Sequence, residues 1–154
     1  MKVMGAGEWA IPFALPSCLN DNQEYFPYSP PEEFYAVIIF HSRSSARTLP
    51  TLFRRLSACE NGQMVRFLHV IPVREEGTPP EGVSPSHKVL IDEDRWVFRA
   101  YTGSSSVSSP ITFVVSPEGI ILRVYPGMSS SDHAEELRCF LKNISVVGVG
   151  SHNR

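Results

Sequence analysis

Short runs of mostly apolar residues, rich in β-branched and aromatic side chains, recur along the chain and predict strands. They cover Phe34–Phe40, Met64–Val73, Lys88–Ile91, Ile111–Val115 and Ile120–Tyr125. The first run contains no polar interruption beyond a tyrosine, which is typical of a central strand covered on both faces of its sheet. A Ser-Pro-Glu-Gly turn separates the last two runs at hairpin distance, so we expect them to pair antiparallel.

Between these runs the apolar spacing changes to that of a helix. One apolar stripe comprises Leu49, Leu52, Phe53 and Leu56, and another comprises Leu137, Phe140, Leu141 and Ile144. A third, shorter stripe of Val97, Ala100 and Tyr101 follows the acidic residues Asp92, Glu93 and Asp94. Carboxylates near a helix N-terminus complement its dipole, so the acidic cluster indicates a helix start rather than a catalytic site.

The predicted order is strand, helix, strand, helix, strand, strand, helix. Crossovers through a helix need parallel strands, whereas the hairpin adds antiparallel ones, so the sheet should be mixed with helices on both faces. A chain of 154 residues with 42% hydrophobic residues can form one core but not two ordinary domains. We therefore expect a three-layer α/β domain over residues 1–145, with residues 146–154 as a flexible C-terminal tail.

Charge and hydropathy argue against several classes of partner. A net charge of -2, with scattered Lys and Arg residues, gives no positive field for nucleic acid or anionic lipid. The segment Met1–Leu15 lacks an unbroken apolar stretch of signal-peptide length, and the longest apolar run, Tyr35–Phe40, is too short to span a bilayer. We expect a cytoplasmic protein without nucleic-acid or membrane partners, or else the trimmed mature form of an exported one.

Four segments carry a resemblance to a known family. In chain order they are Gly7–Pro16, Leu49-Pro50, Val89–Gly103 and Ser109–Gly119. They resemble the entry segment, the kinked first helix, the Asp turn with its helix, and the Pro-Thr-Thr-Phe-Leu-Ile-Asp strand of the redoxin branch of the thioredoxin-like superfamily. That branch includes the AhpC/TSA peroxiredoxins and the TlpA/ResA-like thiol-disulfide oxidoreductases. The resemblance spans residues 7–143 and implies a thioredoxin-like fold, with a mixed central sheet, a terminal β-hairpin and a C-terminal helix.

The family's active-site cysteines have no counterpart here. Its Cys-x-x-Cys pattern, counted forward from Phe40, falls on Ser45 and Thr48, and counted back from Leu49-Pro50 it falls on Ser42 and Ser45. The peroxidatic pattern is also missing. Attack on a disulfide or a peroxide requires a thiolate, so the resemblance makes Ser42, Ser45 and Thr48 degenerate active-site positions. Ser44 or Ser45 is then a candidate N-cap of the first helix.

Pro110 matches the family's cis-proline, which borders the active-site loop and leaves backbone groups able to pair with an extended peptide. The resemblance thus implies a substrate or peptide groove formed by His41, Arg43, Ser44, Ser109 and Pro110. Two interpretations remain open. A protein or peptide still binds in this groove, or the proline is retained only for the fold.

The remaining cysteines and histidines give weaker signals. Cys18, Cys59 and Cys139 have neither disulfide nor metal-ligand spacing. Cys18 lies in a polar stretch and is therefore the candidate for a reactive thiol. The 5 histidines show no ligand pairing, and His41, the one near the active-site loop, is more typical of a solvated or hydrogen-bonded imidazole than of a metal or acid-base site. We expect no metal and no other cofactor.

Two functions fit these observations. The first is a redox-degenerate thioredoxin-like module that binds a peptide or protein. The alternative is a thiol-disulfide oxidoreductase or peroxiredoxin-like enzyme that uses an off-motif cysteine, or whose active-site cysteines have been changed to serine in this sequence. The oligomeric state is left open.

Overall fold

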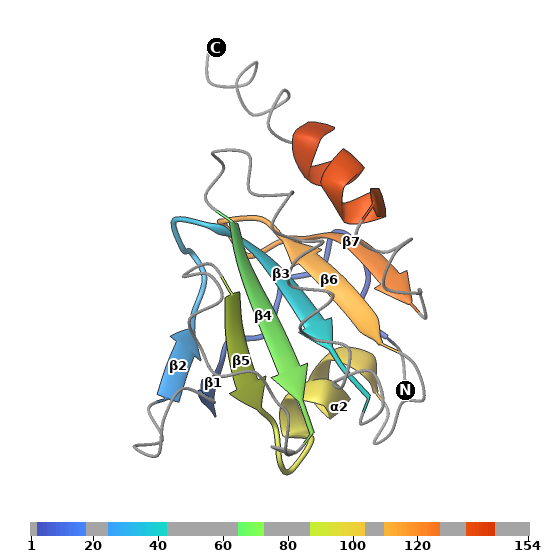
Figure 1. Ribbon diagram of the computed structural model, residues 1–154. Coiled ribbons are helices and arrows are strands. Elements are labelled where there is room, and N and C mark those ends of the chain that lie inside the picture. The colour runs from blue at the N-terminus through green and yellow to red at the C-terminus, as the bar shows by residue number, and fades with distance from the viewer. Residues whose placement is uncertain are drawn as a thin grey trace.

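The computed structural model describes residues 3–17, 25–42, 65–72, 87–103, 110–126 and 135–143. Its central element is a five-stranded sheet in the order β5-β4-β3-β6-β7 (Figure 1). The strands are β3 (Tyr35–Phe40), β4 (Val65–Ile71), β5 (His87–Ile91), β6 (Ile111–Val115) and β7 (Ile121–Pro126). The first predicted strand is therefore interior, as its uninterrupted apolar sequence indicated.

The sheet is mixed. β3 runs parallel to β4 and β4 runs parallel to β5, whereas β3 pairs antiparallel with β6 and β6 pairs antiparallel with β7. This pattern confirms the predicted crossovers and the predicted hairpin. In the hairpin turn, Gly119 has a φ of 105°, and a Cβ atom there would lie 2.7 Å from the side chain of Pro30, so glycine is required on two grounds.

An N-terminal hairpin was not predicted from the sequence. Its strands are β1 (Phe13–Pro16) and β2 (Tyr25–Tyr28), which pair antiparallel. Each has four residues, too few for a period of two to stand out. Isolated bridges join Trp9 to Ile120 and Ser17 to Leu90, so the N-terminal segment reaches from the start of β7 to β5.

Helices cover both faces of the sheet, as expected. On one face α2 (Trp96–Thr102) buries Val97, Phe98 and Tyr101. On the other face a helix at residues 135–143 packs Leu137 and Leu141 against apolar residues of β3, β4 and β6. Figure 1 shows α2 beside the arrowheads of β3 and β4, and the terminal helix near β6 and β7. The helix predicted around Leu49–Leu56 lies outside the described residues.

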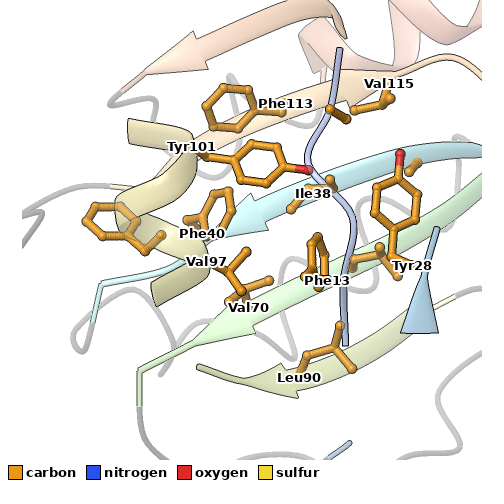
Figure 2. Close-up of a cluster of buried hydrophobic side chains, with 14 of the residues drawn as sticks. Phe13, Tyr28, Ile38, Phe40, Val70, Leu90, Val97, Tyr101, Phe113 and Val115 are labelled. Carbon is orange, nitrogen blue, oxygen red and sulfur yellow. The ribbon is translucent and has the colours of Figure 1, made fainter. Parts of the chain in front are cut away.

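The face beneath α2 holds a cluster of aromatic rings (Figure 2). Phe40 is at its centre, with ring centroids 5.7 Å from Phe98, 5.4 Å from Tyr101 and 5.8 Å from Phe113. The N-terminal hairpin adds Phe13 and Tyr28, whose centroids are 5.3 Å apart. This cluster joins the hairpin, α2 and the sheet into one core. No helix in the described part of the chain has the length and hydropathy to cross a membrane.

Candidate functional site

The carboxyl-terminal edge of the parallel strands carries three polar residues that the sequence singled out, namely His41, Ser42 and Asp92. β3, β4 and β5 all end there, and His41, Pro72 and Asp92 follow them directly. A shallow hollow at this edge is lined by Phe40, His41, Val70, Ile71, Pro72, Asp92, Arg95 and Phe98. Open α/β sheets bind their ligands outside the carboxyl ends of their strands, so this edge is the candidate site.

The register between β3 and β6 brings two predicted groove residues together. Phe40 pairs with Ile111, so continuation of the antiparallel register sets His41 opposite Pro110. Ser42, which the resemblance predicts to be a degenerate active-site position, follows directly, and only 5% of it is exposed. The structure thus gathers His41, Ser42 and Pro110 at one edge.

Other predicted site residues lie outside the described part of the chain. They are Cys18, Arg43, Ser44, Ser45, Thr48 and Ser109. The cis conformation expected for the Ser109-Pro110 bond therefore stays a prediction. The described residues contain a cis bond at Pro30-Pro31. Cys139 is exposed on the helix at residues 135–143, with its Sγ 3.9 Å from Glu135 Oε1.

Asp92 is the buried carboxyl group of the hollow. Its side chain accepts hydrogen bonds from the backbone N–H of Phe98 at 2.9 Å and of Val97 at 3.5 Å. Burial raises the pKa of Asp92, although these hydrogen bonds and the charge of Arg95 act in the opposite direction. Asp92 therefore caps α2, as the acidic cluster indicated. The helix itself begins at Trp96 and has no acidic residue in its first turn, so the three acidic residues precede the helix.

Arg95 connects this turn to α2 in an unusual backbone conformation. Its φ is 61°, in the left-handed region that non-glycine residues seldom occupy. The guanidinium lies 4.3 Å from the centre of the Phe98 ring, within the range of a cation–π contact. Burial lowers the pKa of Arg95, and Asp92 partly offsets this effect. The strained turn thus places a buried carboxylate and a stacked cation side by side in the hollow.

A chain of three buried histidines begins at the same edge. His41 Nε2 lies 3.1 Å from His69 Nδ1, and His69 Nε2 lies 2.9 Å from His87 Nδ1. The rings are nearly parallel, with interplanar angles of 22° and 16°, and their exposed fractions are 2%, 0% and 3%. The sequence left open a solvated or a hydrogen-bonded imidazole for His41, and the structure shows a buried, hydrogen-bonded one. The two contacts between histidines were missed, because His41 and His69 are 28 residues apart in sequence and His69 and His87 are 18 residues apart.

A weak signal for the missed histidines did exist. His69 has apolar neighbours on both sides within its strand, where a buried polar side chain needs a hydrogen-bond partner. Among the described residues, no group of three or more His, Cys, Asp or Glu side chains has an arrangement that could hold a metal ion.

The mixed sheet, with β3 interior and helices on both faces, defines a thioredoxin-like fold. Solved structures with this fold match nearly the full chain. Peroxidoxin BcpB from Mycobacterium tuberculosis superposes with a TM-score of 0.70 at 19% identity, covering 92% of this chain and 98% of that one. AhpC from the same organism gives 0.65 at 14% identity, covering 92% and 95%. A putative thiol:disulfide interchange protein DsbE from Chlorobium tepidum gives 0.65 at 19% identity, covering 89% and 96%.

These likenesses confirm the α/β thioredoxin-like fold that the four sequence segments implied. A scan against protein-family models finds no match, and a search of curated proteins finds none either. At such low identities the structural neighbours define the fold alone, so the activity has to be argued from the site.

Proposed function

We propose that this chain is a thioredoxin-fold module that binds an extended protein or peptide segment at the carboxyl-terminal edge of its sheet, without thiol chemistry at that edge. The observation that carries the proposal is the β3–β6 register, which sets His41 opposite Pro110 with Ser42 directly beyond. A backbone that leaves a strand end at this position offers hydrogen-bonding groups to an extended ligand.

The absence of sulfur at this position supports the binding role over a redox one. A thiolate attacks a disulfide or a peroxide and then cycles through a new disulfide or a sulfenic acid. A serine hydroxyl does neither. The chain has cysteines at 18, 59 and 139 only, and none of them falls between His41 and Thr48.

A redox assay tests the negative half of the proposal. Insulin reduction with dithiothreitol, and peroxide consumption with a thioredoxin system, should both stay at the level of the control without protein. The double variants Ser42→Cys/Ser45→Cys and Ser45→Cys/Thr48→Cys should raise insulin reduction in one of the two registers. As a matched control, Glu135→Cys/Arg138→Cys places the same spacing on exposed positions of the terminal helix and should not raise it.

A binding assay tests the positive half. Linear peptides selected from a displayed library on the immobilised full chain should shift the backbone amide signals of His41, Ser42 and Ile111. Pro110→Ala should weaken their binding about tenfold, or ~1.4 kcal/mol. Pro117→Ala is the matched control, because this proline lies just beyond the other end of β6 and is also half-buried. Peptides that bind both variants equally would place the site elsewhere.

The alternative function is a thiol enzyme that uses an off-motif cysteine. It is favoured by the fold, which this chain shares with proteins described as a peroxidoxin and a thiol:disulfide interchange protein. Turnover by the unmodified chain that Cys18→Ala abolishes would establish this alternative. Turnover that persists in Cys18→Ala but is lost in Cys139→Ala would instead assign it to the exposed thiol of the terminal helix.

A further inference from the structure

Arg95 brings a positive charge to the hollow at the carboxyl-terminal edge, and the described part of the chain supplies no acceptor for it. Its Nε atom is buried without a hydrogen-bond partner, and no ion pair is formed with the guanidinium by any described residue. Buried polar groups in proteins are nearly always hydrogen-bonded, and a charged group without partners is costly to remove from water. The guanidinium is therefore a candidate for pairing with a ligand.

The carboxylate that shares the hollow with Arg95 is already used. One oxygen of Asp92 accepts the backbone N–H of Phe98 at 2.9 Å, and the other accepts that of Val97 at 3.5 Å. Asp92 therefore caps α2 and is directed at its amides rather than at the guanidinium. A ligand at this position would meet the side chain of Arg95, because the helix terminus is occupied.

The local structure holds Arg95 where a ligand can reach it. Its backbone has a φ of 61°, and such strained conformations cluster at ligand-binding and active sites. One face of the guanidinium is stacked on the ring of Phe98 at 4.3 Å, which orients the planar group. The residue is half-buried, so part of it remains accessible, and it lines the same hollow as His41.

We propose that Arg95 binds a carboxylate of the extended segment at the carboxyl-terminal edge, so that the site selects acidic peptides. This inference rests on the proposed peptide binding. The planar fork of an arginine matches a carboxylate through two parallel N–H···O bonds, and arginines in such positions often dominate an interface. The carboxylate belongs to an Asp or Glu side chain or to the C-terminus of the segment, and both sources have the same chemistry.

The other charges around Arg95 indicate that recognition depends on direct contact. Glu93 and Asp94 are exposed just before it, so no positive field extends into solvent to attract an anion from a distance. Arg99 is also exposed, but its Nη1 donates to the carbonyl of Asp94 at 2.7 Å. Arg99 thus resembles Arg95 in charge and position but already has an acceptor, which makes it the matched control.

The first test changes the peptide and leaves the protein intact. Linear peptides selected on the immobilised full chain are titrated calorimetrically, and each is compared with analogues in which one Glu becomes Gln, one Asp becomes Asn, or the C-terminus becomes an amide. One of these changes should weaken binding about tenfold, and its position tells a side-chain carboxylate from a terminal one. Peptides that tolerate all three changes overturn the inference.

The second test changes the protein. Arg95→Gln should weaken the acidic peptide about tenfold but leave its neutral analogue unchanged, so that the two peptides bind the variant equally. Arg99→Gln removes the same charge one helical turn away and should preserve the difference between the peptides. Equal weakening of both peptides by Arg95→Gln would show a merely structural role for this arginine and would overturn the inference.

A third measurement on the wild-type chain remains decisive if Arg95→Gln fails to fold. The Nε–H nuclear magnetic resonance signal of Arg95, assigned by its loss in Arg95→Lys, should shift with the acidic peptide and stay in place with the neutral one. A signal that moves equally with both peptides, or with neither, overturns the inference.

These tests separate the inference from the function on which it rests. Peptides that lose affinity for Pro110→Ala but ignore the carboxylate changes would leave the proposed function standing and overturn carboxylate recognition alone. Failure to select any peptide, or equal binding to wild type and Pro110→Ala, would overturn both. Peptides that respond both to Pro110→Ala and to the loss of one carboxylate support both.

Discussion

The two faces of the central sheet are built differently. Beneath α2 and the N-terminal hairpin the core is apolar, with interlocking rings around Phe40. Beneath the terminal helix, Val37, Ile39 and Phe67 share their face of the sheet with His69 and His87. Both faces are closed to solvent, since His69 on one face and Phe113 on the other each have an exposed fraction of 0%.

The two faces are therefore stabilised in different ways. An apolar cluster stabilises a fold through the area that it removes from water, and its parts can be exchanged for others of similar shape. A buried polar chain is stable only while each of its groups keeps its hydrogen-bond partners. We therefore expect substitutions on the two faces to differ in size and in additivity.

The largest effect should come from the aromatic face. Phe40→Ala removes a ring that is 1% exposed and contacts three other rings, so it should lower the free energy of unfolding by about 3–5 kcal/mol. Denaturant unfolding measures this change. Trp9→Ala removes a large ring that is 65% exposed and should change stability by only about 0.5 kcal/mol. Similar losses in the two variants would mean that the Phe40 cluster does not stabilise the fold.

The histidine face should show a smaller but non-additive effect. His69→Leu removes both hydrogen bonds of the chain and should lower stability by about 1–3 kcal/mol. His87→Leu should then have less effect in the His69→Leu background than in the wild type, by about 0.5–3 kcal/mol in a double-mutant cycle. Strict additivity would contradict the view that the histidines act as one unit.

Two buried tyrosines of the aromatic face differ in whether their hydroxyl group is hydrogen-bonded. The Tyr101 hydroxyl donates a hydrogen bond to the carbonyl of Ile11 at 2.7 Å, whereas the buried Tyr28 hydroxyl has no partner among the described residues. Tyr101→Phe should lower stability by about 0.5–1.5 kcal/mol. Tyr28→Phe should be neutral or stabilising by thermal unfolding. The opposite ranking would show that the hydroxyl of Tyr101 does not hold the N-terminal segment.

Asp92, in the hollow at the carboxyl-terminal edge, should make the free energy of unfolding depend on pH. Burial raises the pKa of Asp92 above its ordinary value of 3.8, so the folded state holds this proton more tightly than the unfolded state. Its contribution to stability is present at low pH and is lost as the pH rises from 3.8 through the raised pKa. Asp92→Asn keeps an acceptor for the α2 amides and should remove that decline, so the variant gains stability relative to wild type as the pH rises. A constant difference between the two proteins across this window would contradict the assignment.

The smallest effect should come from the outer surface of the terminal helix. Glu135 and Arg138 form an ion pair at 2.7 Å with side chains 61% and 50% exposed. Exposed pairs contribute about 0–1 kcal/mol, and salt weakens them further. Glu135→Gln should therefore change the unfolding midpoint little, and less still at high salt. A loss comparable to that of Leu137→Ala would mean that this helix is held by charge rather than by its buried leucines.

The sequence predicted the central sheet well because its signals are local. The uninterrupted run of β3, the turn between β6 and β7, and the apolar stripe of the terminal helix each lie within a short stretch of chain. Such patterns follow from the periods of strands and helices, which depend little on the rest of the molecule. The N-terminal hairpin was not predicted because a strand of four residues is too short to show a clear alternation of apolar and polar positions. These strands are stabilised by the packing of Phe13 and Tyr28 in the core, which the local sequence does not reveal.

The candidate site likewise has features that the sequence shows and features that appear only in the tertiary structure. The sequence by itself determined that Ser42, Ser45 and Thr48 carry hydroxyl groups and not thiols, and that a proline precedes β6, because these are statements about residue identity. Only the tertiary structure decided that His41, His69 and His87 form one chain. Parallel strands are joined through long crossovers, and their register is set by packing between distant segments rather than by any pattern within one of them. A one-residue slip of β4 or β5 would move its histidine to the other face of the sheet and break the chain.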